Sequence, residues 1–252
     1  TRCAKVYKEA DLRSFRQAVD YTENRKVKNT RAARAMAKGT RFGKQVQEAA
    51  WQSAEVDALY RLAAAGVRVP QPYNFHEGVL LMELVADEDG EPAPRLNDLS
   101  LSEEDALAYH AVLIRQVVRM LCAGIVHGDL SEYNVLVDAG GPVIIDLPQA
   151  VDAAANNNAK RMLGRDVDNL ADYFGQFAPQ LLATRYGDEI WALYESGALH
   201  PDSELSGRFE DAAGDVNLDE VMQVIEAADE EEEERLARQA AARAEGEWRE
   251  GE

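Results

Sequence analysis

The chain has 252 residues, 46% of them hydrophobic and 29% charged, which suits one two-lobed domain or two small domains with a sizeable core. It has no apolar run of membrane-spanning length and no signal-peptide pattern, and its formal net charge of −19 repels anionic surfaces on average, so no membrane partner is expected. Cys3 and Cys122 stand among apolar residues and are expected to be buried thiols, which favours a cytoplasmic location.

The first 85 residues are predicted to contain two strands and a helix. Cys3 to Tyr7 forms a short strand in which Cys3, Lys5 and Tyr7 share one face. A helix is predicted from about Val46 to Ala65, where apolar residues recur at helical spacing, and Gly66 ends it. The apolar run from Val79 to Leu84 is predicted to be a buried strand.

A basic segment, residues 25–44, lies between the first strand and this helix. It carries eight cations and no acid, namely Arg25, Lys26, Lys28, Arg31, Arg34, Lys38, Arg41 and Lys44. Such a segment resists packing into a core, so we expect a mobile connection that engages an acidic partner. The partners considered are RNA and the acidic tail of the chain itself, residues 229–252. A solvated loop without a partner is the alternative.

Residues 86–228 are predicted to be mainly helical around a small β-hairpin. An acidic loop, 87–94, precedes a helix that begins after Ser102, where Asp105 completes a capping box, and ends at Gly124. Extended pieces follow at 125–126, 135–137 and 143–145, and the turn at 138–141 joins the last two into a hairpin. From 159 to 228 the chain is expected to be mostly helical.

Three polar residues with oxygen-bearing side chains flank these extended pieces: Asp129, Asn134 and Asp146. Phosphoryl transfer needs a carboxylate near the attacking hydroxyl and hard oxygen ligands for a divalent metal that holds the phosphate oxygens. A lysine on a strand, Lys5, can neutralise the phosphates that do not react, and a helix glutamate such as Glu55 can orient this lysine. Each residue alone is more often a turn or surface residue, but together and in this order they predict a phosphotransferase.

Four sequence segments resemble the RIO family of atypical serine/threonine protein kinases, over about residues 1–175. The segments are Cys3-Ala4-Lys5-Val6-Tyr7-Lys8, His127-Gly128-Asp129-Leu130-Ser131-Glu132-Tyr133-Asn134, Ile144-Ile145-Asp146-Leu147-Pro148-Gln149-Ala150-Val151 and Arg165-Asp166-Val167-Asp168-Asn169-Leu170. The resemblance is to the first RIO subgroup and its bacterial relatives. It implies an α+β, two-lobed protein-kinase-like fold, with a small β-rich N-lobe in residues 1–85 and a mainly helical C-lobe in residues 86–228. The glycine-rich phosphate loop of such kinases does not precede Lys5, so the sequence is expected to be incomplete at its N-terminus and the N-lobe truncated.

The resemblance also implies roles for single residues. It makes Asp129 the acid at the acceptor hydroxyl, and it makes Asn134 and Asp146 the ligands of Mg²⁺ or Mn²⁺, with Asp146 also proposed to become a transient acyl phosphate. ATP would be bound through Lys5, its ion-pair partner Glu55, Met82 behind the adenine, and the backbone of Glu83 and Val85. Asp166 resembles a support of the catalytic loop, and an ordinary acid near a helix N-terminus is an equal alternative.

Two other functions remain open. Aminoglycoside and choline kinases also carry His-Gly-Asp with a downstream Asn, although Ser131-Glu132 and the run from Pro148 to Val151 favour the RIO family. A nucleotide-sensing scaffold with little turnover is the second alternative. RIO proteins of eukaryotes and archaea act in ribosome maturation, which suggests a ribosome-related partner for residues 25–44. That role is not assumed for the bacterial relatives, which this chain resembles at Leu147-Pro148-Gln149.

Overall fold

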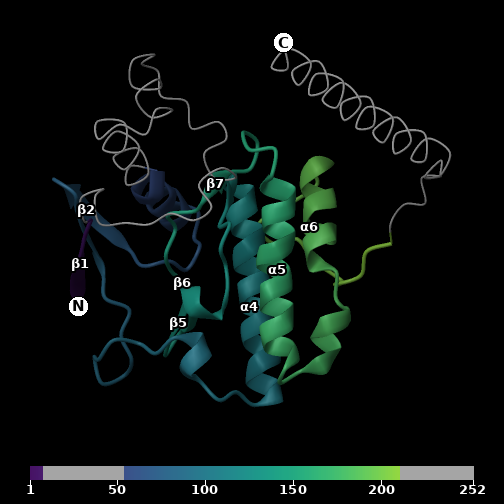
Figure 1. Ribbon diagram of the computed structural model, residues 1–252, viewed down its shortest axis with the longest axis horizontal. Coiled ribbons are helices and arrows are strands. Elements are labelled where there is room, and N and C mark those ends of the chain that lie inside the picture. Colours follow the sequence, from purple (N-terminus) through teal and green to yellow (C-terminus); the bar gives the residue numbers. More distant parts are fainter. Residues whose placement is uncertain (8–53, 211–252) are drawn as a thin grey trace, which may run out of the picture. The chain divides into compact units, whose positions relative to one another are not determined.

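The computed structural model describes residues 1–7 and 54–210 of the chain (Figure 1). The basic segment 25–44, the predicted helix before residue 54 and the acidic tail 229–252 lie outside these residues, so their predictions stay untested. The described part contains a small antiparallel sheet, a β-hairpin and a group of helices, within a compact unit that spans Thr1–Phe209.

A three-stranded antiparallel sheet is built from both ends of the predicted N-terminal part. Its strands are β1 (Arg2–Val6), β2 (Pro72–His76) and β3 (Val79–Glu83), in the order β1-β3-β2. Lys5 lies opposite Leu80 in the register. Cys3 and Lys5 are partly covered and Tyr7 is buried, whereas Ala4 and Val6 are exposed, which confirms the predicted alternation of β1.

A helix follows the undescribed segment, and its described part covers residues 54–64. Val56, Leu59 and Leu62 recur at helical spacing and are buried in the main hydrophobic core. Gly66 ends the helix with a φ of +74°, a conformation that glycine adopts without steric cost. The predicted end of this helix is therefore confirmed.

The long helix α4 (Glu103–Cys122) follows a short 3-10 helix, η2 (Leu96–Asp98). The amide of Asp105 donates a 3.1 Å hydrogen bond to the Ser102 hydroxyl, which confirms the capping interaction at the start of α4. Leu113, Val117 and Leu121 form part of its buried face.

Short strands surround the predicted catalytic residues. They are β4 (Ile125–Val126), β5 (Val135–Asp138), β6 (Gly141–Ile144) and β7 (Val151–Asp152), with the 3-10 helix η3 (Glu132–Asn134) before β5. β5 and β6 form the predicted hairpin, and β4 pairs with β7, a strand that sequence analysis did not identify. These pairings bring the chain after β4 and the chain after β6 to the same region.

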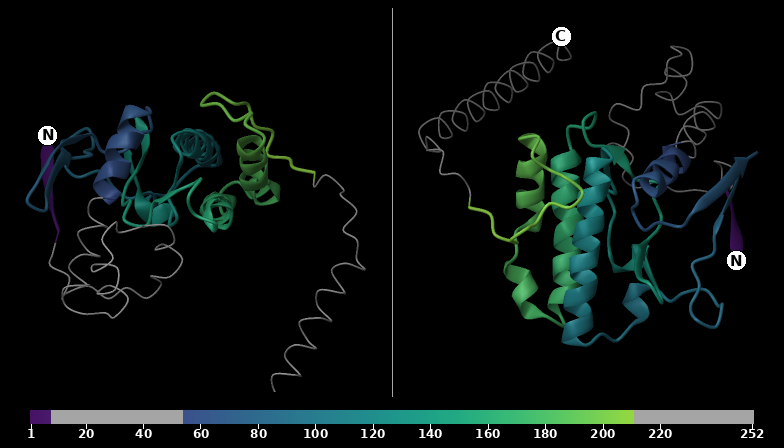
Figure 2. Two further views of the ribbon diagram at one scale, coloured as in Figure 1. Left: turned by 90° about the horizontal axis from the view of Figure 1, so that it is seen from above. Right: turned by 180° about the vertical axis from the view of Figure 1, so that it is seen from behind.

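The second half of the helical group consists of α5 (Ala159–Gly175), the 3-10 helix η4 (Pro179–Ala183) and α6 (Tyr186–Glu195). Helices α4, α5 and α6 lie side by side, and the three-stranded sheet lies at the opposite side from α6 in both figures (Figures 1 and 2). The prediction of helix beyond α6 is wrong for residues 196–210, which form turns and irregular chain. Gly197 and Gly207 adopt positive φ and Pro201 lacks an amide donor, so this segment cannot continue a helix.

The prediction of two buried thiols is also wrong. Cys122 is exposed and Cys3 is only partly covered. Cys122 follows the buried Leu121 at the end of α4, and consecutive residues of a helix point in different directions, so the apolar neighbours in sequence do not cover it. Among the helices of the described residues, none is both long enough and apolar enough to cross a membrane.

Candidate active site

A cavity of about 370 Å³ opens between the three-stranded sheet and the β5–β6 hairpin. Its apolar walls come from the sheet, the 54–64 helix and the hairpin region, and its polar groups gather where β1, the helix and the end of β6 meet. The lining residues are Cys3, Lys5, Glu55, Leu59, Pro70, Leu80, Met82, Glu83, Leu84, Val85, Pro92, Arg95, Tyr133, Asn134, Leu136, Ile145, Asp146 and Leu147. The cavity thus gathers the sequence-predicted site residues other than Asp129.

Lys5 lies between two carboxylates at the polar end of this cavity. Its ammonium group forms an ion pair with Glu55, and it donates a second hydrogen bond of 3.4 Å to Asp146. Glu55 is 6% exposed, so the Lys5 charge compensates a carboxylate that water scarcely reaches. Asp146 remains exposed and is free to take another cation.

The backbone of Asp146 adopts a φ of +65°, which is uncommon for a residue with a side chain and costs free energy. The neighbouring Ile145 holds this conformation, because its amide donates a 3.0 Å hydrogen bond to the Asn134 carbonyl and its own carbonyl accepts one from His127. Strained backbone maintained by its surroundings is frequent at functional sites.

The loop that carries Asp129 is held in place by Asp166 on α5. The buried Asp166 carboxylate accepts hydrogen bonds from the amides of Gly128 (2.7 Å) and Leu130 (2.9 Å), the two residues that flank Asp129. Burial raises the pKa of Asp166 to about 7, against the lowering effect of these amides and of Arg165. Asp129 itself stays exposed, so a rigid loop presents its carboxylate to the exterior.

His127 connects the Asp129 loop with the strand that leads to Asp146. Its Nε2 lies 3.1 Å from the Ile145 carbonyl, and its Nδ1 accepts a 3.3 Å hydrogen bond from the Asp129 amide. Because the ring is buried, its pKa falls to about 4, and the neutral ring with a proton on Nε2 satisfies both contacts. His127 is therefore a structural member of the loop rather than a base.

Asn134 and Asp129 lie at the two ends of the same turn. The Asn134 amide nitrogen donates a 2.8 Å hydrogen bond to the Asp129 carbonyl, which leaves the amide oxygen as a potential metal ligand. Arg165 donates a hydrogen bond to the carbonyl of Gly128. Partial burial of the carboxyl raises the pKa of Asp129 although the residue is exposed, and nearby Asp146 acts in the same direction, whereas Arg165 opposes both effects. A raised pKa suits a carboxylate that accepts a proton from an acceptor hydroxyl.

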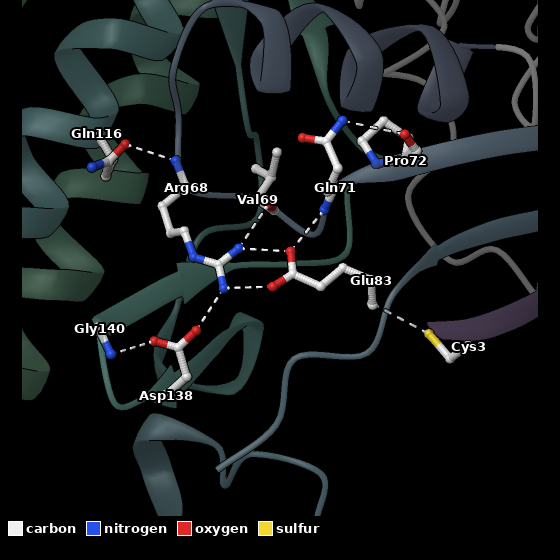
Figure 3. A network of polar contacts seen from close by, with 9 residues as sticks. All are labelled: Cys3, Arg68, Val69, Gln71, Pro72, Glu83, Gln116, Asp138 and Gly140. Carbon is white, nitrogen blue, oxygen red and sulfur yellow. Dashed lines mark hydrogen bonds and ion pairs between the residues drawn. The ribbon is translucent and has the colours of Figure 1, made fainter. Parts of the chain in front are cut away.

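The predicted adenine-binding segment lies at the end of β3. Met82, Glu83 and Val85 line the cavity, and the Val85 amide has no hydrogen-bond partner among the described residues. The Glu83 carboxylate is paired with Arg68 at 2.8 and 2.9 Å (Figure 3). Sequence analysis missed this arginine, whose only signal was a lone charge among apolar residues before Pro70.

The RIO domain family matches residues 3–186 of the chain. The chain belongs to the RIO domain family. It is 44% identical over 126 residues to the RIO-type serine/threonine-protein kinase Rio1 of Haloferax volcanii, which covers 50% of this chain and 42% of the relative. It is 36% identical over 124 residues to the RIO-type serine/threonine-protein kinase Rio1 of Thermoplasma acidophilum (49% of this chain, 63% of the relative). The serine/threonine-protein kinase RIO1 of Homo sapiens is 34% identical over 136 residues, 54% of this chain and 24% of the relative.

The match of each of these relatives covers less than two thirds of its length. A RIO domain has a protein-kinase-like fold, and the mixture of helices with small antiparallel sheets confirms the predicted α+β class. The RIO family was identified correctly from the sequence segments around Lys5, Asp129, Asp146 and Asp166.

The residues of this RIO domain fit a hard divalent cation at the polar end of the cavity. Asp146 and Asn134 supply oxygen donors, which Mg²⁺ and Mn²⁺ prefer, and Lys5 lies beside them. Within the described part of the chain, no three His, Cys, Asp or Glu side chains gather in a metal-binding group. This donor set suits a cation that completes its coordination with water and phosphate oxygens rather than a fully protein-bound ion.

Proposed function

We propose that this chain is an ATP-dependent serine/threonine protein kinase of the RIO type. The observation that carries the proposal is the single cavity that joins an apolar end, near Met82 and Val85, to a charged end with Lys5, Glu55 and Asp146. A purine needs an apolar slot with backbone hydrogen-bond groups, and a triphosphate needs cations at a fixed distance from it. The names of the RIO1 relatives support the same activity.

Each residue has a distinct task in this proposal. The Val85 amide and the Glu83 backbone meet the adenine edge, and Lys5, oriented by Glu55, neutralises phosphate oxygens. Asp146 and Asn134 would hold Mg²⁺ or Mn²⁺, which offsets phosphate charge when bound. Asp166 and His127 are positioning residues, because they bond the backbone near Asp129 and Asp146 and do not line the cavity.

Asp129 serves the acceptor side of the reaction. Its exposed carboxylate accepts the proton of a serine or threonine hydroxyl as the hydroxyl oxygen bonds to the γ-phosphorus and the bond between that phosphorus and ADP breaks. Hydrolysis of ATP through an acyl phosphate on Asp146 is a second outcome of the same site. In this route a carboxylate oxygen of Asp146 bonds to the γ-phosphorus as the bond between that phosphorus and ADP breaks, with no proton to remove. Water then cleaves the acyl phosphate, which releases phosphate and restores the Asp146 carboxylate.

Incubation with γ-labelled ATP and Mg²⁺ tests the proposal. We expect labelled phosphate in a general protein acceptor or in the chain itself. Label released by hydroxylamine would indicate the acyl phosphate, and stable label would indicate phosphoserine or phosphothreonine. Asp129→Asn and Asp146→Asn should each lower turnover by about a hundredfold or more, whereas Asp98→Asn, an exposed acid outside the cavity, should not change it. Normal turnover in either catalytic variant would contradict the assignment.

The finer parts of the proposal concern the whole protein. We propose a two-lobed arrangement, with residues 1–85 as the small lobe and 86–228 as the large lobe, and a cytoplasmic location. We also propose RNA as the partner of the basic segment 25–44, supported by its eight cations without an acid. Replacing Arg31, Arg34, Lys38 and Arg41 with Ser should weaken RNA binding and reduce its salt dependence. Binding by the unchanged protein that does not respond to salt would contradict this proposal.

A further inference from the structure

Arg68 brings together two carboxylates from separate elements of the fold (Figure 3). Its Nη1 and Nη2 donate hydrogen bonds of 2.8 and 2.9 Å to the two oxygens of Glu83, at the end of β3. The same Nη2 donates a 2.5 Å hydrogen bond to Asp138, the last residue of β5. A planar guanidinium suits this paired geometry, and a lysine cannot reproduce it.

The backbone of Arg68 is attached to the helical part of the molecule. Its amide donates a 3.0 Å hydrogen bond to the side chain of Gln116 on α4, and its carbonyl accepts a 3.0 Å bond from the amide of Ile144 on β6. Arg68 is therefore fixed at both ends, by its backbone on α4 and β6 and by its side chain on Glu83.

Glu83 receives further support from the neighbouring residue Gln71. The Glu83 amide donates to the Gln71 carbonyl at 2.8 Å, and the Glu83 carboxylate accepts from the Gln71 amide at 3.0 Å. The side chains of Glu83 and Asp138 are only 26% and 15% exposed, so water screens these ion pairs less than it screens a surface pair. This network fixes the residue at which the cavity wall leaves the sheet.

We propose that Arg68 is a positioning residue for the nucleotide, acting through Glu83 on the cavity wall from Glu83 to Val85. The inference rests on the proposed nucleotide-binding function of this cavity. Without the guanidinium, two like-charged carboxylates lie near each other and the wall samples other positions. If the wall keeps its nucleotide-binding conformation in only about a tenth of the molecules, the apparent nucleotide Kd rises about tenfold. The phosphate end, which contacts neither Arg68 nor Asp138, keeps its own affinity.

Nucleotide binding to the whole chain, measured by calorimetry, tests this inference. In Arg68→Gln we expect the Kd of a nonhydrolysable ATP analogue and the Kd of adenosine to rise by about the same tenfold factor. Competition by tripolyphosphate, which probes the charged end alone, should stay unchanged. Arg68→Lys keeps the positive charge but not the paired donors of the guanidinium, and we expect the Kd of the ATP analogue to rise about threefold. The double variant Arg68→Gln/Glu83→Gln should bind no more weakly than either single variant, because the two residues act as one unit.

Arg61 provides a matched control. It lies on the 54–64 helix, donates to the Ala123 carbonyl at 2.8 Å and pairs weakly with Asp152, but it does not line the cavity. Arg61→Gln should leave the Kd of the analogue unchanged. An unaltered Kd in Arg68→Gln, or an equal loss in Arg61→Gln or for tripolyphosphate, would overturn the inference. Absence of nucleotide binding in the unchanged protein would instead overturn the proposed function.

Discussion

Replacing Asp166 with Asn tests how the catalytic loop is held. The Asp166 carboxylate accepts amide hydrogen bonds from both Gly128 and Leu130, whereas the amide of an asparagine can accept only one and presents its own N–H₂ group to the other donor. A hydrogen bond to a charged group contributes about 1.5–3 kcal/mol, so its loss should lower kcat roughly tenfold to a hundredfold.

Stability should change in the opposite direction to activity. Raising the pKa of Asp166 from 3.8 to about 7 corresponds to roughly 4 kcal/mol of unfavourable free energy for the ionised carboxylate, which the neutral amide avoids. The unpaired backbone amide costs about 1–3 kcal/mol in return. These effects oppose each other and leave a net gain, so Asp166→Asn should raise the free energy of unfolding at pH 8 by about 1–3 kcal/mol.

The pH dependence provides the second readout. Between pH 3.8 and about 7 the folded protein keeps a proton on Asp166 that the unfolded chain has released, so stability contributed by this group falls as the pH rises through this range. Ionised Asp166 holds both loop amides, so kcat should rise with pH and level off above about 7. In Asp166→Asn this rise should disappear.

Steady-state kinetics and urea unfolding across this pH range are the assays. Asp168→Asn is the matched control, because Asp168 is an exposed acid on the same helix and the loop amides of Gly128 and Leu130 bond Asp166 instead. An Asp166→Asn variant with normal kcat would refute the reasoning. So would a loss of activity that is fully explained by the fraction of unfolded protein. A rise near pH 7 that persists in this variant would assign the titration to Asp129 instead.

Three further predictions concern the charged end of the cavity. Asp146→Gly and Asp146→Ala should both lose turnover. The Gly variant should be more stable in urea unfolding by about 1 kcal/mol, because a φ of +65° strains alanine. Equal stabilities of the two variants would contradict this backbone strain. Lys5→Met should raise the ATP KM about tenfold or more, and it should destabilise the protein because the charge of Glu55 is left uncompensated. The double variant Lys5→Met/Glu55→Gln should recover the stability but not the ATP affinity. A Lys5→Met variant as stable as the double variant would argue against a buried ion pair. Excess EDTA should abolish turnover and added Mg²⁺ or Mn²⁺ should restore it, and undiminished activity in EDTA would exclude a metal requirement.

Local patterns in the sequence were sufficient for much of the fold. The alternation around Lys5, the cap at Ser102 and the turn at 138–141 each depend on residues close together in the chain, where chain geometry fixes which side chains meet. The chain from 196 to 210 was mistaken for helix because the glycines and the proline that prevent it were outweighed by the helical pattern before it.

The residues of the site that belong to short sequence segments were also predictable, and the resemblance to RIO kinases supplied the distant Lys5–Glu55 pair. The contacts of Arg68 were not predictable. Asp129, Asn134 and Asp146 occur within one loop and hairpin, so their spacing alone indicated a common location. Arg68 and Asp138 are 70 positions apart, and neither has a neighbour in sequence that signals the other. A lone arginine in irregular chain has the same sequence signature whether it is solvated or bonded to two carboxylates.

The buried imidazole of His127 acts as a spacer of fixed length between two parts of the proposed active site. One ring nitrogen contacts the carbonyl of Ile145, the residue before Asp146, and the other contacts the backbone amide of Asp129, so the aromatic ring sets the separation of the two backbone segments. The ring cannot stretch, whereas a chain of flexible side chains could. One rigid ring and two hydrogen bonds therefore set the spacing between the backbone that carries Asp129 and the backbone that precedes Asp146.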